Sequence, residues 1–138
     1  MTSAEQGLAA TSAVRRYGSG GPWEDAVGYS RVVVAGPWLL TAGCTATVDG
    51  VVVHVGDAGA QAREAFTIAL TALASAGATV EDVVRTRMYI RDRADAGAVG
   101  AAHAEFFGDV RPTTAMYVIA GFVHPDHLVE VEVEAYKP

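Results

Sequence analysis

Residues 111–135, RPTTAMYVIAGFVHPDHLVEVEVEA, contain the clearest structural pattern of the chain. Residues 128–135 are LVEVEVEA, in which apolar and acidic residues alternate strictly from residue 129 onward. A period of two predicts a β-strand with valines on a buried face and carboxylates, Glu130, Glu132 and Glu134, on the opposite face. These glutamates form either the solvated side of an edge strand or a functional surface.

The composition is typical of one globular domain. The chain has 138 residues, of which 51% are hydrophobic and 19% are charged, enough to bury about two-thirds of the unfolded surface. No apolar run approaches the roughly 18 residues of a membrane span, and the first residues lack the pattern of a secretory signal. The single cysteine, Cys44, excludes an internal disulfide and indicates a reducing cytoplasm. The net charge of −6 does not favour nucleic acid as a partner.

Strand and helix patterns continue upstream of this segment. Turn signals and apolar runs predict strands at 31–35, 38–44, 51–55, 83–90, 114–119 and 128–135. Helices are expected from Asp57 to the stop at Gly77 and from 95 to 107. The first 20 or so residues are expected to be loosely ordered. The order βββαβαββ predicts an α+β fold in one domain, residues 1–138, with two helices packed on one face of a six-stranded mixed sheet.

This packing leaves one sheet face without helices. In the strand at 83–90, Val84 and Met88 are expected to face the helices together with Thr86 and Ile90, whereas Arg85, Arg87 and Tyr89 face away. The uncovered face is either solvated or packed against another subunit. A symmetric oligomer is favoured, because a small sheet with one open face commonly closes in that way.

Short motifs along the chain support a more specific assignment. They are GYS (28–30), TAG (41–43), QAR (61–63), AGA (76–78), EDVVRT (81–86), FFG (106–108) and LVEVE (128–132). With the element order, they resemble the Rid/YjgF/YER057c/UK114 family from about residue 21 to residue 135. PWE (22–24), RTRMY (85–89), RPTTAM (111–116) and PDHLVEVE (125–132) resemble a subgroup of it. The resemblance implies a cytoplasmic homotrimer with a chorismate-mutase-like fold and a pocket between subunits. It also implies metabolite damage control, in which enamines and imines are hydrolysed to 2-keto acids and ammonia without metal or cofactor.

The resemblance carries site roles to particular residues. The glutamate that holds water falls on Glu130, the aromatic at the pocket mouth on Tyr29, and the substrate-receiving backbone pair on Ala42 and Gly43. The arginine that anchors the substrate carboxylate falls on Thr114. A hydroxyl offers one neutral hydrogen bond in place of two charge-assisted ones, so the standard 2-aminoacrylate activity is not expected.

Several other residues are candidates for the same pocket. Met116 is expected beside Thr114 as a lining residue. Arg31 or Arg87 either replaces the missing carboxylate clamp or pairs with Glu132 or Glu134. Glu24 either lines the pocket mouth or is a solvated loop carboxylate.

The remaining polar side chains are weaker candidates. Cys44 lies next to Gly43, and an inert buried thiol is favoured over a nucleophile. His103 is expected to be a packing histidine rather than a catalytic one. His124 and His127 lie in a turn with no third ligand in sequence, so no metal site is predicted.

Two functions of different class remain open. One is a hydrolase of a small imine, enamine or related metabolite, with Glu130 positioning water. The other is a non-catalytic trimer that binds a small carboxylate or carbonyl ligand in the same pocket. An endoribonuclease activity fits poorly with an acidic chain that lacks a basic groove.

Overall fold

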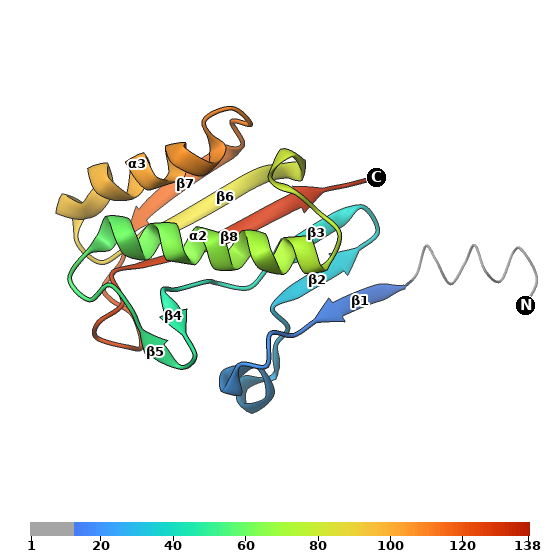
Figure 1. Ribbon diagram of the computed structural model, residues 1–138, viewed down its shortest axis with the longest axis horizontal. Coiled ribbons are helices and arrows are strands. Elements are labelled where there is room, and N and C mark those ends of the chain that lie inside the picture. Colours follow the sequence, from blue (N-terminus) through green and yellow to red (C-terminus); the bar gives the residue numbers. More distant parts are fainter. Residues whose placement is uncertain (1–12) are drawn as a thin grey trace, which may run out of the picture.

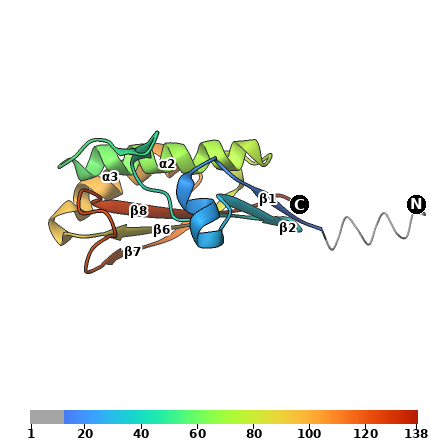
Figure 2. The ribbon, with the colours of Figure 1, turned by 90° about the horizontal axis from the view of Figure 1, so that it is seen from below.

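The strand predicted from the alternating segment, β8 (Val129–Tyr136), lies at the centre of the fold. In the computed structural model, which describes residues 13–138, six strands form one mixed sheet in the order β1-β2-β3-β8-β6-β7. Only β6 and β7 are parallel neighbours. Two helices, α2 (Ala58–Ser75) and α3 (Ala96–Phe107), cover the same face (Figures 1 and 2), so the predicted fold class is confirmed. The other sheet strands are β1 (Val14–Tyr17), β2 (Val32–Ala35), β3 (Trp38–Thr41), β6 (Val83–Ile90) and β7 (Thr113–Val118).

The alternation in β8 sorts its side chains as predicted. Val129, Val131 and Val133 are completely buried beneath the helices, and the three glutamates that alternate with them are half-buried on the other face. Gln61 of α2 ties the start of this strand to the helix layer. Its side-chain amide donates to the Asp126 carbonyl at 2.9 Å and accepts from the Leu128 amide at 2.8 Å.

Two predicted strand assignments were wrong. The segment at 51–55 does not enter the main sheet, because β5 (Val51–Val52) pairs only with β4 (Thr47–Val48) in a separate hairpin. The sixth strand of the sheet is β1, which lies within the segment expected to be loose and pairs with β2 along its whole length. Residues 1–12 of that segment lie outside the described part of the chain.

Strand β6 departs from simple alternation at its start. A register shift between Val83 and Arg85 places Val83 in the core and leaves Val84 40% exposed. The prediction that Val84 faces the helices was therefore wrong, since a bulge inserts one residue and moves its neighbours to opposite faces. From Thr86 onward the alternation is regular.

The helix-free face carries both charged and aromatic side chains. Arg87 donates to Glu134 at 2.6 Å, and the rings of Tyr89 and Tyr117 stack with centroids 5.6 Å apart. Figure 2 shows that neither α2 nor α3 covers this face. None of the helices within residues 13–138 is long and apolar enough to span a bilayer. Three short helical turns, η1 (Glu24–Gly28), η2 (Val80–Asp82) and η3 (Arg93–Asp95), complete the described elements.

Candidate functional site

The candidate site lies where β3 separates from β8. Backbone pairing between them ends at Leu40, and the Thr41 hydroxyl then accepts from the Val133 amide at 3.0 Å. Pairing resumes at Cys44, which exchanges two backbone hydrogen bonds with Val131. Ala42 and Gly43 lie in the interruption, so their backbone groups are not used in the β8 ladder. The predicted strand 38–44 thus ends at Thr41, three residues early.

Glu130 packs directly against this interruption. A Cβ atom placed on Gly43 would lie 2.8 Å from the Glu130 Cδ and would overlap its Oε1. The carboxylate therefore occupies the space that the missing side chain leaves. The structure brings together these two residues, which sequence comparison placed in one site, although they lie 87 positions apart in the chain.

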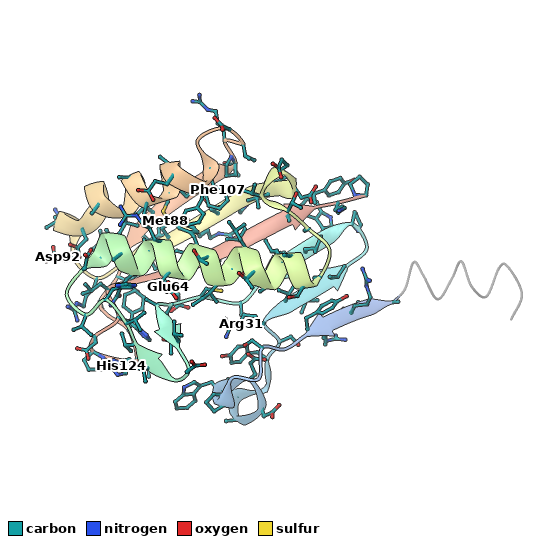
Figure 3. The ribbon with its side chains drawn as sticks, viewed as in Figure 1. Arg31, Glu64, Met88, Asp92, Phe107 and His124 are labelled. Atoms are coloured by element: carbon teal, nitrogen blue, oxygen red, sulfur yellow. The ribbon has the colours of Figure 1, made fainter. Side chains whose placement is uncertain are left out.

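Arg31, which immediately precedes β2, forms a cluster with Glu130, Gly43 and Tyr29. Its Nη1 donates to the Gly43 carbonyl at 2.7 Å and approaches the Cys44 Sγ at 3.7 Å. Its Nη2 donates to the Tyr29 hydroxyl at 3.3 Å. The side chain is only 15% exposed, and Figure 3 shows it near the start of β2, below α2 in that view. The alternative pairing with Glu132 or Glu134 does not occur, because its nearest carboxylate is that of Glu24 at 3.8 Å.

The surroundings of Glu130 favour its protonated form. Burial raises the pKa of this carboxyl above its ordinary value, the charge of Glu132 adds to the shift, and Arg31 opposes it. The cation that opposes the shift is thus Arg31 and not Arg87. Arg87 pairs with Glu134 and lies 3.9 Å from Glu132. Of the two roles considered for Arg87, the structure therefore shows the ion pair and not a carboxylate clamp.

Cys44 has the environment of an inert thiol. It is 1% exposed, and its Sγ donates to the Ala42 carbonyl at 3.4 Å. Burial raises the pKa of the thiol, although Arg31 opposes this shift. A protonated and inaccessible thiol is a poor nucleophile.

Glu24 is buried, so the alternative of a solvated loop carboxylate was wrong. It is 7% exposed and accepts hydrogen bonds from the Ser19 amide, at 2.9 Å, and from the Ser19 hydroxyl. Burial alone would raise the pKa of Glu24, but these hydrogen bonds and the charge of Arg31 hold it below the ordinary value. Sequence reasoning missed Ser19, for which the neighbouring glycines, at 18, 20 and 21, were the only signal.

A shallow hollow of about 720 Å³ on the open sheet face adjoins the cluster. Tyr29 and Ala42 line it together with Glu24, Thr41 and Leu40. Gly43 and Arg31 directly follow the lining residues Ala42 and Ser30 in the chain. Tyr29 is 38% exposed and stands at its edge. The hollow therefore leads to the break between β3 and β8.

Thr114 and Met116 are not part of this cluster within one chain. They lie on the edge strand β7, which β6 separates from β8. The Thr114 hydroxyl donates to the Thr86 carbonyl at 3.1 Å and accepts from the Thr86 hydroxyl at 2.7 Å. A pocket that includes both Thr114 and Glu130 thus requires a second copy of the chain.

His103 extends the threonine pair into the helix layer. Its Nε2 lies 2.7 Å from the Thr86 hydroxyl oxygen, and its ring packs against Phe66 and Phe107. Burial lowers the pKa of His103 below its ordinary value, which favours the neutral ring. These contacts are those of a packing histidine.

No group of three or more His, Cys, Asp or Glu side chains within residues 13–138 is arranged to hold a metal ion. His127 instead lies 2.8 Å from the Thr47 hydroxyl. His124 accepts from the Asp126 amide at 3.0 Å. Both histidines are thus used in the hydrogen bonding of their own turn and of the neighbouring hairpin.

Comparison with known proteins agrees with this architecture. Residues 23–137 match the family described as endoribonuclease L-PSP. The chain is 43% identical over 127 residues to the protein SCO2049 of Streptomyces coelicolor, covering 92% of this chain and 95% of that protein. It is 41% identical over 81 residues to the 3-aminoacrylate deaminase RutC of Acinetobacter baylyi, covering 58% of this chain and 63% of RutC.

A solved structure resembles both the sequence and the fold. Rv2704 of Mycobacterium tuberculosis, a member of the YjgF/YER057c/UK114 family, superposes with a TM-score of 0.81 at 42% identity, covering 90% of this chain and 99% of that chain. The family match spans almost all described residues, including the break between β3 and β8. The chain therefore belongs to the endoribonuclease L-PSP family, also known as the YjgF/YER057c/UK114 family.

Proposed function

We propose that this protein hydrolyses a small enamine or imine at the cluster formed by Glu130, Gly43, Arg31 and Tyr29. The observation that carries the proposal is the half-buried Glu130 carboxyl, packed against Gly43 with a raised pKa. A carboxyl with a raised pKa is a stronger base than an ordinary carboxylate, so it can both accept a proton and return it during a reaction. The similarity to RutC supports this reaction class, because 3-aminoacrylate is an enamine.

The reaction needs one water molecule and several proton transfers. The enamine takes a proton from solvent on the carbon next to its C–N carbon and becomes an iminium. Water then adds to the C=N carbon while Glu130 accepts the water proton, which forms a carbinolamine. Glu130 returns that proton to nitrogen, the C–N bond breaks with release of ammonia, and the hydroxyl of the carbinolamine gives its proton to solvent, which leaves a carbonyl product. The sum is enamine plus water giving carbonyl plus ammonia.

Arg31 acts in this scheme as a positioning residue. It fixes the Gly43 carbonyl and the Tyr29 hydroxyl, and its charge offsets the carboxylate form of Glu130. Arg87 is not free to bind a substrate carboxylate, because two glutamates already pair with it. Together with Thr114, this supports a substrate that does not depend on a carboxylate clamp.

The test of catalysis is ammonia release over a panel of enamines and imines generated in situ. We expect Glu130→Gln to lower turnover by about 10²-fold, because the amide accepts no proton. Glu134→Gln, the same substitution four residues along the same strand face, is the matched control. Equal effects of the two substitutions in every assay would show that Glu130 is only one of several surface charges.

Substrate scope provides a separate test. We expect 2-aminoacrylate to be hydrolysed slowly, because Thr114 offers one neutral hydroxyl whose proton is already donated to Thr86. Pyruvate formation from a serine dehydratase reaction measures this rate, and Thr114→Arg should increase it. A rapid wild-type reaction would show that another residue binds the carboxylate.

A non-catalytic binding function is the second candidate, and the absence of an arginine at Thr114 favours it. In that case ligands bind in the hollow beside Tyr29, but no member of the panel releases ammonia faster than in buffer. Glu130→Gln would then change ligand affinity alone.

We also propose that the protein is a homotrimer that packs its helix-free sheet faces together. The exposed Trp38, Leu40 and Tyr117 side chains and the Arg87–Glu134 pair on this face support such a contact. Light scattering at micromolar concentration tests it, and a monomer mass would refute it. The net charge of −6 gives no support to RNA as the substrate.

A further inference from the structure

A chain of three side chains connects helix α3 with the edge of the sheet. It joins His103 of α3, Thr86 of β6 and Thr114 of β7. The Thr86 Oγ1 lies 2.7 Å from the His103 Nε2 and 2.7 Å from the Thr114 Oγ1. Strand β7 is the edge strand next to β6 (Figure 1). Thr86 is completely buried and Thr114 is exposed, so the chain runs from the core to a hydroxyl at the surface.

The direction of these hydrogen bonds follows from the number of protons. Each hydroxyl has one proton to donate. Thr114 donates its proton to the Thr86 carbonyl at 3.1 Å, so its oxygen accepts the proton of the Thr86 hydroxyl. Thr86 has then used its only proton and must accept from the His103 Nε2. The neutral ring of His103 therefore carries its proton on Nε2.

The surroundings of the chain keep it in place. The His103 ring packs against Phe66 at a centroid distance of 5.5 Å and against Phe107 at 4.7 Å. The Thr86 side chain is not exposed to solvent, and a buried hydroxyl without partners is costly. Both hydrogen bonds of Thr86 are therefore retained, and His103 acts as a positioning residue in addition to its packing.

The consequence is that Thr114 presents an acceptor and no donor. Its oxygen has two lone pairs, of which one takes the Thr86 proton, and within residues 13–138 the other remains for a ligand. A carboxylate has only acceptor atoms, so it would face this lone pair without a proton between them. A primary carboxamide has the same shape as a carboxylate and offers N–H groups. Thr114 therefore discriminates between these two groups in favour of the amide.

We propose that the relay from His103 through Thr86 holds the Thr114 hydroxyl as an acceptor, and that the candidate site takes a small enamine or imine with a primary carboxamide in place of a carboxylate. This inference rests on the proposed hydrolase function for its reaction, and on the proposed trimer for the approach of Thr114 to Glu130. The preference for the amide is a property of binding, so it is measured without turnover.

The test is a titration of the full-length isotope-labelled protein with pyruvamide and with pyruvate, followed by amide NMR. These are the carbonyl products that the amide and the acid substrates would give. We expect saturable shifts at residues 113–116 with pyruvamide and at least about tenfold weaker binding of pyruvate. Absence of saturation with pyruvamide, or equal affinity for the two, would overturn the proposal. If pyruvamide binds in this way but no enamine or imine releases ammonia, the hydrolase proposal alone fails.

The relay has a spectroscopic signature of its own. Long-range ¹⁵N NMR of the histidine ring distinguishes the two neutral tautomers, and we expect the proton of His103 on Nε2. A proton on Nδ1 would mean that Thr86 donates to the histidine, and the proposed relay would be wrong.

Substitutions at neighbouring positions of β7 provide matched variants. Thr114→Val removes the hydroxyl at nearly constant shape, so the affinities for pyruvamide and pyruvate should come within about twofold of each other. Thr114→Ser keeps the hydroxyl and should keep the preference. Thr113→Val is the control, because Thr113 lies on the opposite face of the same strand. An unchanged preference in Thr114→Val would show that the net charge of −6 excludes pyruvate, and would overturn the role of Thr114.

Discussion

A substitution at Gly43 distinguishes the contribution of the Gly43–Glu130 contact to stability from its contribution to catalysis. A Cβ atom at this position would overlap Glu130 Oε1 and lie 2.8 Å from Cδ and 3.3 Å from Cγ. In Gly43→Ala the carboxylate must therefore withdraw by roughly 1 Å, and a displacement of that size lowers turnover by about 10²-fold.

The cost in stability should be small. Glu130 ends in a flexible side chain, and an off-rotamer torsion costs about 0.5–1.5 kcal/mol. Against this, alanine reduces the entropy of the unfolded chain, which contributes about 0.4–1 kcal/mol where the backbone is compatible. Gly43 does not have a positive φ, so its backbone accepts alanine. We expect the free energy of unfolding to change by less than about 1 kcal/mol, or about 3 °C in Tm.

The assay combines urea unfolding with ammonia release from the best substrate of the panel. Gly43→Ala/Glu130→Gln should be no slower than Glu130→Gln alone, because both substitutions act through one carboxylate. Gly100→Ala is the matched control. A Cβ there would meet only Met116 Cε at 4.0 Å, so this variant should keep its turnover and gain about 0.5–1 kcal/mol.

Two results would refute the reasoning. A loss of more than about 3 kcal/mol in Gly43→Ala would show that Glu130 cannot withdraw and that the contact supports the fold. Unchanged turnover in Gly43→Ala, with strongly reduced turnover in Glu130→Gln, would show that the position of the carboxylate is not critical.

Three further outcomes follow from the buried ionisable groups. Burial raises the folded-state pKa of Glu130, so its contribution to stability is present below its ordinary pKa of 4.5 and is lost as pH rises through the folded value. In urea unfolding across this pH range, the wild type should therefore lose stability relative to Glu130→Gln. Glu24 has a lowered pKa, so its carboxylate stabilises the fold at neutral pH. Glu24→Gln should lower the free energy of unfolding by about 1–3 kcal/mol at pH 7, and this loss should shrink as pH falls below 4.5. A loss independent of pH would contradict an ionised Glu24. Cys44 should resist a thiol reagent in the native protein and react once urea unfolds it, whereas rapid native labelling would show an accessible thiolate.

Much of the fold follows from periodicity in the sequence. The valine–glutamate alternation within residues 128–135 predicts β8 and its two faces, because successive side chains of a strand point in opposite directions. The helices were also recognisable, since Asp57 accepts from the Ala60 amide at the start of α2 as a capping residue does. Family motifs placed Glu130, Gly43 and Tyr29 in one site.

Other features depend on contacts between distant segments, which periodicity does not encode. Val14–Tyr17 is a strand only because β2 offers it a free edge, whereas the apolar run at 51–55 finds no partner in the main sheet. The inversion of Val83 and Val84 comes from a bulge against β8. Strand propensity depends on such neighbours more than on the residues themselves.

The site shows the same division. The sequence by itself determined that Glu130 lies on the polar face of a strand and that Gly43 follows another strand. Only the tertiary structure decided that the carboxylate fills the space beside Gly43, that Arg31 rather than Arg87 is its cation, and that Glu24 is buried against Ser19. The physical reason is that the environment of a charge is set by the burial and the charges around it in three dimensions, and these come from residues that are remote in the chain.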